Sequence, residues 1–152
     1  MQKVMETIVT EVARPAGAPQ VIPLYASRPA AGFPAPGDDL VERVLDINDL
    51  VVKNPASTFF VRVEGDSMTG AGIFSGDVLV VDRAVDAKDG HIVVAAVNGE
   101  MVVKRLRSET PSKGLNPLLQ LVSENENYQP ITIGEGEECY IWGVVVGSIR
   151  QF

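Results

Sequence analysis

The sequence predicts a mainly β protein: a compact, twisted β barrel or sandwich with an extended, proline-rich N-terminal arm and one short helix. From residue 58 onward, short runs of apolar and β-branched residues alternate with Gly, Pro and Asn, as is typical of short strands joined by turns. Six of the ten prolines lie before residue 37, where they forbid long helices and remove backbone donors. A chain of 152 residues suits one domain with a buried core.

The N-terminal segment, residues 1–39, is predicted to be extended or irregular, with room for one short strand at residues 5–12. Its composition fits a disordered tail, and the alternative is an arm that lies across its own or a partner's body. A helix-turn-helix reader needs several helices, which this segment cannot supply. We therefore expect no direct sequence-specific DNA binding and no repressor function.

One short helix is expected near residues 46–53, after an extended lead-in. Asp46 is a suitable N-cap, and the apolar residues that follow it fall on one side of a helix. Asn54-Pro55 then ends the helix, because the residue before a proline avoids helical geometry.

The remaining elements are predicted as strands. They cover residues 59–63, 78–82, 91–97, 101–107, 118–123, 131–133 and 140–147. The strongest local signal is Asn98-Gly99, because both residues tolerate the positive φ of a type I′ hairpin turn. This hairpin fixes where Lys104 lies in the sheet.

The candidate chemistry rests on Ser67 and Lys104. Ser67 follows Gly65-Asp66 on a turn between two apolar strands, so we expect it to be presented rather than buried. A serine hydroxyl needs a base to become a nucleophile. Lys104 is the better candidate base, because its i±2 neighbours are apolar and a poorly solvated ammonium gives way to neutral amine. Each residue also has a plainer interpretation, as a turn serine capping its own backbone and a solvated strand lysine.

Composition narrows the class of protein. With 13 basic and 20 acidic residues the net charge is −7, which argues against broad adhesion to nucleic acid or anionic membrane. The single cysteine cannot form an internal disulfide, which fits a reducing cytoplasm. The first residues lack the apolar run of a signal peptide, and no apolar stretch is long enough to span a bilayer. We expect a cytoplasmic protein without a membrane partner.

Taken together, these motifs resemble the LexA/UmuD group of self-cleaving serine peptidases. The resemblance runs from about Ala30 to the C-terminus and combines several segments. They are Gly65-Asp66-Ser67-Met68, a lysine 37 residues later in Val-Lys-Arg-Leu, Gly32-Phe33-Pro34-Ala35-Pro36, Asn54-Pro55-Ala56-Ser57-Thr58, and residues 92–97 and 128–133. It implies a fold of the LexA C-terminal type, a Ser67–Lys104 dyad, an arm over residues 1–39 that carries the cleavage site, and a peptidase-like domain over residues 40–152.

The resemblance also implies a cleavage site and partners. The inferred scissile bond joins Ala31 and Gly32, a pair usual in the related repressors, and the backbone N–H groups of Asp66 and Ser67 are the natural oxyanion donors. Activated RecA–single-stranded DNA filaments would stimulate cleavage in the SOS response to DNA damage. The shortened homodimer would then join a UmuC-type subunit as an error-prone translesion DNA polymerase.

Other chemistry has little support in the sequence. His91 is interpreted as a strand-edge residue and Cys139 as a small buried hydrophobe. One histidine and one cysteine make a transition-metal site improbable, and no nucleotide-binding motif occurs, so no cofactor or metal is predicted.

Two other classes of function stay open. A signal-peptidase-like enzyme acting in trans would also use Ser-Met and Lys, but should carry a membrane anchor. A catalytically silent protein-binding module would keep its arm intact under all conditions, whereas cleavage of added peptides would favour the trans-acting enzyme.

Overall fold

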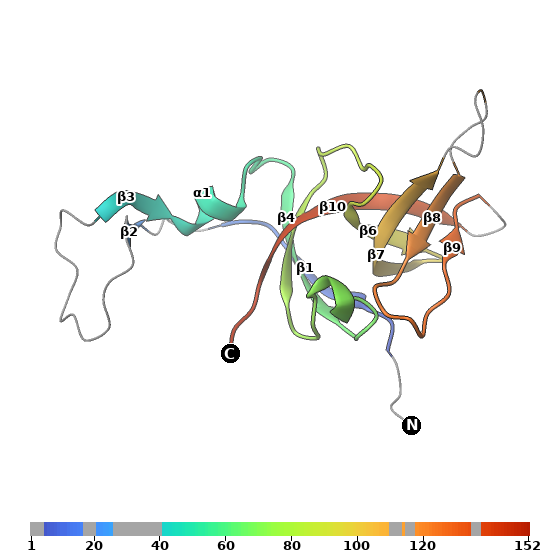
Figure 1. Cartoon of the computed structure of the whole chain (residues 1–152). Helices are drawn as coiled ribbons and strands as arrows, with labels where there is room; N and C mark the ends of the chain where they lie inside the picture. The colour runs from blue at the N-terminus through green and yellow to red at the C-terminus, as the bar shows by residue number, and fades with distance from the viewer. Residues whose placement is uncertain (1–4, 17–20, 26–40, 110–113, 115–117, 135–137) are drawn as a thin grey trace.

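In the computed structural model, eight strands of the described chain form one antiparallel sheet (Figure 1). The structure describes residues 5–16, 21–25, 41–109, 114, 118–134 and 138–152. In sheet order the strands are β1 (Ile8–Ala13), β4 (Thr58–Glu64), β5 (Val78–Asp82), β10 (Cys139–Ile149), β6 (Ile92–Val97), β7 (Glu100–Glu109), β8 (Leu118–Val122) and β9 (Ile131–Thr132). The predicted mainly β architecture is confirmed.

The sheet closes on itself through its first strand. β1 pairs along its length with β4 and also meets β7, where Ile8 lies opposite Val102. A sheet whose first strand reaches across to a distant one is a barrel rather than an open layer. β1 lies inside the segment predicted as an arm, and it starts later than the predicted strand at residues 5–12. The predicted division of the chain at residue 39 stays a prediction.

A smaller unit lies to one side of this sheet (Figure 1). β2 (Val21–Tyr25) and β3 (Val41–Asp46) form a two-stranded antiparallel sheet, and α1 (Ile47–Val51) leads from β3 toward β4. The sequence indicated extended chain but not this pairing. Pro23 is compatible with it, because each strand of a two-stranded sheet has a free edge.

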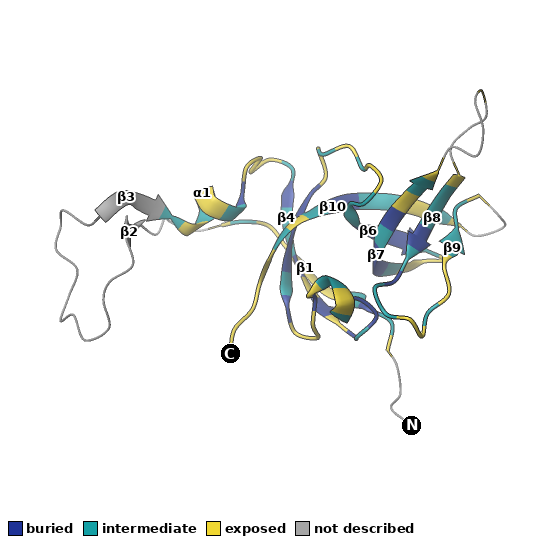
Figure 2. Cartoon of the chain, viewed as in Figure 1, coloured by how far each residue is buried: buried dark blue, intermediate teal, exposed yellow. Residues whose placement is uncertain are grey.

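The predicted helix is confirmed, although it is shorter than residues 46–53. The side chain of its N-cap, Asp46, accepts a hydrogen bond from the backbone N–H of Asn48 at 2.9 Å. None of its residues is buried, and Figure 2 shows it largely exposed. In the described part of the chain, no helix is long and apolar enough to cross a membrane.

The β6–β7 hairpin forms as predicted. Asn98 and Gly99 have φ values of 51° and 83°, and Val97 pairs with Glu100 across a two-residue loop. The resulting register sets Val93 opposite Lys104. His91 lies just before β6, where its Nδ1 accepts a hydrogen bond from the Lys88 backbone.

The core divides between the two faces of β6, whose middle residues are all buried (Figure 2). Val94 belongs to one apolar cluster, while Val93 and Ala95 belong to the other. The first cluster also contains Val61, Val63, Met68, Ile73, Leu79, Val81 and Val103. The second also contains Leu106, Leu121 and Val144, and the half-buried Cys139 packs against it. A fully buried aliphatic side chain contributes about 1.5–3 kcal/mol, so both clusters hold the frame of the site rigid.

Candidate active site

Ser67 lies on the loop that follows β4, between a glycine turn and an anchored methionine. Gly65 has φ +116°, which favours glycine, and the side chain of Met68 is fully buried in the first core cluster. The 3-10 turn Thr69–Ala71 follows directly. The burial of Met68 therefore fixes the Ser67 loop against the core.

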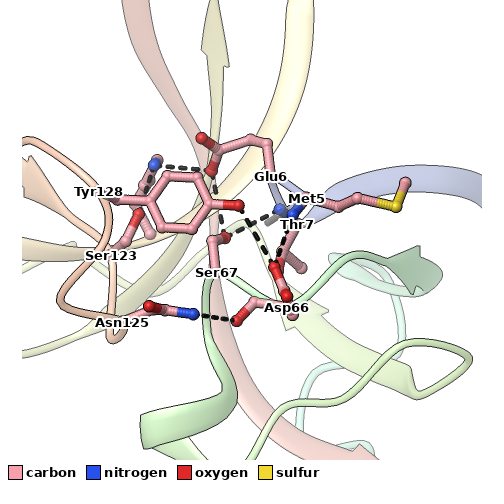
Figure 3. Close-up of polar contacts among 9 residues, drawn as sticks. Met5, Glu6, Thr7, Asp66, Ser67, Ser123, Asn125 and Tyr128 are labelled. Atoms are coloured by element: carbon pink, nitrogen blue, oxygen red, sulfur yellow. Dashed lines mark hydrogen bonds and ion pairs between the residues drawn. The ribbon is translucent and has the colours of Figure 1, made fainter. Parts of the chain in front are cut away.

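Ser67 is fully buried, which differs from the expected exposure. The cover is the protein's own N-terminal segment, Met5 to Thr7, which lies against the loop (Figure 3). A Cβ on residue 65 would lie 2.2 Å from the backbone carbonyl oxygen of Glu6. The glycine is thus required both by its backbone conformation and by the close approach of this segment.

Lys104 lies on β7 with its side chain buried at 1% exposure. Its neighbours Val102 and Leu106 are buried too, as the apolar spacing in the sequence indicated. The lysine side chain is therefore buried, and its contacts with other polar groups are made at Nζ. Nζ lies 2.6 Å from Ser123 Oγ, and it is 5.4 Å from the centre of the Tyr128 ring.

Ser67 and Lys104 meet at one atom, Oε1 of Glu6. The Ser67 hydroxyl donates to this oxygen at 3.2 Å (Figure 3). Lys104 Nζ lies 2.7 Å from the same oxygen in an ion pair. The functional groups of the two predicted residues therefore converge on the same point. In this ion pair Nζ is an ammonium, which has no lone pair with which to accept a proton.

The N-terminal segment is also bound through its backbone. The Asp66 N–H donates to the Met5 carbonyl at 2.8 Å, the Thr7 N–H donates to Ser67 Oγ at 2.8 Å, and the Val103 N–H donates to the Thr7 carbonyl at 3.0 Å. Of the two predicted oxyanion donors, the Asp66 amide thus already binds a peptide carbonyl. The site holds an extended peptide by adding it to strand edges.

Residues after β8 join the two halves of the site. The Gly70 N–H donates to the carbonyl of Glu124 at 2.8 Å, and the Asn125 side-chain amide donates to the carbonyl of Asp66 at 3.1 Å. The Tyr128 hydroxyl donates to Asp66 Oδ1 at 3.3 Å. Burial, followed by the charge and hydrogen bond of Asp66 and by the charge of Glu6, raises the pKa of Tyr128 to about 12. The ring therefore stays neutral next to Lys104 over most of the accessible pH range.

The remaining sequence predictions divide clearly. The predicted scissile pair, Ala31 and Gly32, lies outside the described residues. Glu6, Ser123 and Tyr128 were missed by the sequence reasoning. Tyr128 lies in the segment 128–133 that carries part of the family resemblance, and Ser123 lies at the end of the predicted strand 118–123, but neither was assigned a role. Nothing in the local sequence marks Glu6 as a partner of Ser67.

Comparisons with known proteins agree on one family. The family model described as Peptidase S24-like matches residues 23–146. Protein ImpA of Salmonella typhimurium is 39% identical over 148 residues, which cover 97% of each chain. Protein SamA of Salmonella typhimurium strain LT2 is 42% identical over 129 residues, 85% of each chain. The LexA repressor of Bordetella pertussis is 36% identical over 141 residues, which cover 92% of this chain and 61% of the repressor.

Proposed function

Because this chain belongs to the peptidase S24-like family, in the UmuD-like branch that includes ImpA and SamA, we propose that it is a self-cleaving serine peptidase. The reaction is hydrolysis of the Ala31–Gly32 bond in its own N-terminal segment. Ser67 is the nucleophile and Lys104 is the base.

One observation carries this proposal. A single oxygen of the protein's own N-terminal segment contacts both the Ser67 hydroxyl and Lys104 Nζ, at 3.2 Å and 2.7 Å. A base must reach the proton that it takes, either directly or through one bridging atom, and here the bridging atom belongs to an extended stretch of the same chain. A tethered substrate has a high effective concentration, which suits a weak catalyst that acts once.

The steps follow from the two groups. Neutral Lys104 takes the proton of the Ser67 hydroxyl as the oxygen attacks the carbonyl carbon of Ala31. Backbone N–H groups at Asp66 and Ser67 receive the developing oxyanion. The proton then passes to the amine of Gly32 as the peptide bond breaks, leaving an ester between Ser67 and Ala31 that water hydrolyses.

The arrangement of the N-terminal segment at the site is a closed one. Residues 5–7 and the scissile peptide cannot both occupy Ser67 Oγ, so the N-terminal contact must open before cleavage. Opening also breaks the ion pair between Glu6 and Lys104. Cleavage is therefore slow at rest and responds to anything that favours the open form.

Family membership supports the biological setting of this proposal. The protein acts in the cytoplasm as a homodimer in the SOS response, and RecA–single-stranded DNA filaments promote its cleavage. The shortened homodimer then serves as the accessory subunit of a UmuC-type error-prone translesion polymerase.

The test is intact-mass spectrometry of the purified protein, held from neutral to strongly alkaline pH, beside Ser67→Ala and Lys104→Ala. A fragment that begins at Gly32 should accumulate faster as pH rises, because neutral Lys104 becomes more abundant, and neither variant should produce it. If no fragment forms even after RecA filaments are added, the self-cleaving peptidase is refuted and a silent binding module takes its place. Cleavage of added peptides with an intact N-terminal segment would instead favour an enzyme acting in trans.

A further inference from the structure

Ser123 lies beside Lys104 in the continued register of two paired strands. Arg105 pairs with Val122, and Ser123, the next residue after β8, faces Lys104. Its Oγ accepts a hydrogen bond from Nζ at 2.6 Å. Ser123 is only 8% exposed and Lys104 only 1%, so the contact is sheltered from solvent.

The contact between Lys104 and Ser123 does not depend on the N-terminal segment that covers the site. Nζ has two hydrogen-bonding partners among the described residues, Glu6 and Ser123. Glu6 belongs to the segment that must leave before a peptide reaches Ser67, whereas Ser123 belongs to the sheet. A neutral amine has two N–H bonds and one lone pair. When one N–H is held by Ser123, the possible directions of the lone pair are restricted.

We propose that Ser123 is a positioning residue that holds Lys104 Nζ so that its lone pair faces the Ser67 hydroxyl. This inference rests on the proposed function, in which Lys104 is the base. Ser123 does not touch the peptide; it acts through the lysine.

The residues that come after Ser123 strengthen the case. The Glu124 carbonyl accepts from the Gly70 N–H at 2.8 Å, and the Glu124 side chain pairs with Arg105, the neighbour of Lys104 on β7. The Asn125 amide donates to the carbonyl of Asp66 at 3.1 Å. One short segment thus fixes the lysine strand on one side and the serine loop on the other, and Ser123 is its point of contact with the base.

The packing against Gly70 shows how tightly this segment is held. A Cβ added at Gly70 would lie 2.6 Å from the Glu124 carbonyl oxygen. The absence of a side chain at residue 70 therefore leaves room for the segment that carries Ser123. The spacing between serine and lysine is therefore sensitive to this contact.

The expected pH dependence is set by the groups that face Nζ. These are the Glu6 carboxylate from the N-terminal segment, the Ser123 hydroxyl and the neutral Tyr128 ring. The Ser67 hydroxyl contacts the same Glu6 oxygen as Nζ. A hydroxyl that accepts from the ammonium stabilises the charged form. Removing the hydroxyl therefore favours the neutral amine, so the midpoint of the cleavage profile moves to lower pH while the amine loses its orientation.

The experiment measures the rate at which the Gly32 fragment appears, from pH 7 to strongly alkaline pH, by intact mass. Ser123→Ala should lower the alkaline plateau about 10- to 100-fold and shift the midpoint downward. Ser123→Thr retains a hydroxyl and should stay within about threefold of the parent. Ser108→Ala, on the same strand as Lys104, is the matched control and should leave both plateau and midpoint unchanged.

The outcomes separate the two proposals. If the parent cleaves and Ser123→Ala matches it in plateau and midpoint, the positioning role is refuted and the proposed function stands. The positioning role is also refuted if Ser123→Ala lowers the plateau without moving the midpoint and Ser123→Thr does not restore the plateau. General loosening of the fold explains that result. If the parent never cleaves, the proposed function fails, and the inference fails with it. Should Ser123→Ala not fold, Ser123→Cys keeps the volume with a weak hydrogen-bonding group, and the same plateau and midpoint criteria apply.

Discussion

The contact of Glu6 with Ser67 and Lys104 gives the sharpest prediction of the proposed function. Glu6→Gln keeps the size of the side chain but removes the charge that pairs with Lys104 at 2.7 Å. A hydrogen bond to a charged group contributes about 1.5–3 kcal/mol. Because the Glu6 side chain is 33% exposed, solvent screening reduces this to about 1–2 kcal/mol. The open form should therefore gain about 5- to 30-fold in population, and cleavage should speed up by the same factor.

The assay is a time course of the Gly32 fragment at neutral pH, with Glu11→Gln as the matched control. Glu11 lies on β1, five residues after Glu6, and pairs with Arg62 on β4 at 3.5 Å, with both side chains well exposed. The control should stay within about twofold of the parent. An unchanged or slower rate in Glu6→Gln would falsify the closed arrangement as the cause of slow cleavage.

The pH dependence provides a second check of the same reasoning. The ion pair between Glu6 and Lys104 exists only while the lysine is charged, so the advantage of Glu6→Gln should shrink toward one as alkaline pH removes the proton. A ratio that stays constant with pH would show that the variant acts through something other than this ion pair.

Three further predictions concern stability. In chemical denaturation, Gly65→Ala should lower the free energy of unfolding clearly more than Gly72→Ala. Both glycines have a positive φ, which costs alanine about 1–2 kcal/mol, but only Gly65 also lies against another backbone segment. Equal losses of stability would contradict this close approach. The hydrogen bonds and charge of Arg150 hold the pKa of Asp77 below its usual value of 3.8, so the Asp77–Arg150 pair stabilises the fold above about pH 4. Asp77→Asn should lower the free energy of unfolding by about 2 kcal/mol at pH 7, and its melting temperature should approach that of the parent as pH falls through the lowered pKa of Asp77. The pKa of Tyr128, raised to about 12 from 10.0, means that stability falls as pH rises from about 10 to 12; Tyr128→Phe should remove that part of the decline in alkaline melts.

The sequence predicted those features that local residues decide. The Asn98-Gly99 turn set the β6–β7 register, and with it the buried environment of Lys104, because both depend on backbone preferences and apolar spacing within a few residues. The α1 N-cap was predictable from the side chain of Asp46 for the same reason.

The features that the sequence did not predict depend on pairing between distant segments. Glu6 and Ser67 are separated by 61 residues, and their contact exists because β1 pairs with β4 in a particular register. No periodicity within either segment encodes that register. The burial of Ser67 was missed for this reason, since the loop alone would present the hydroxyl, and residues 5–7, which precede β1, cover it.

The pairing of β1 with β4 also bears on what would follow the proposed cleavage. Five residue pairs join the two strands, from Ile8 opposite Glu64 to Ala13 opposite Phe60. The β1 residue of each pair lies upstream of residue 31 and its β4 partner lies downstream, so a cut at the proposed site would leave the N-terminal peptide still paired with β4. Cleavage of the peptide bond and dissociation of the N-terminal peptide would then be separate events with separate rates. Denaturing mass spectrometry measures cleavage of the peptide bond, and native mass spectrometry measures dissociation of the N-terminal peptide. The delay between the two signals gives the time for which the cleaved peptide stays bound.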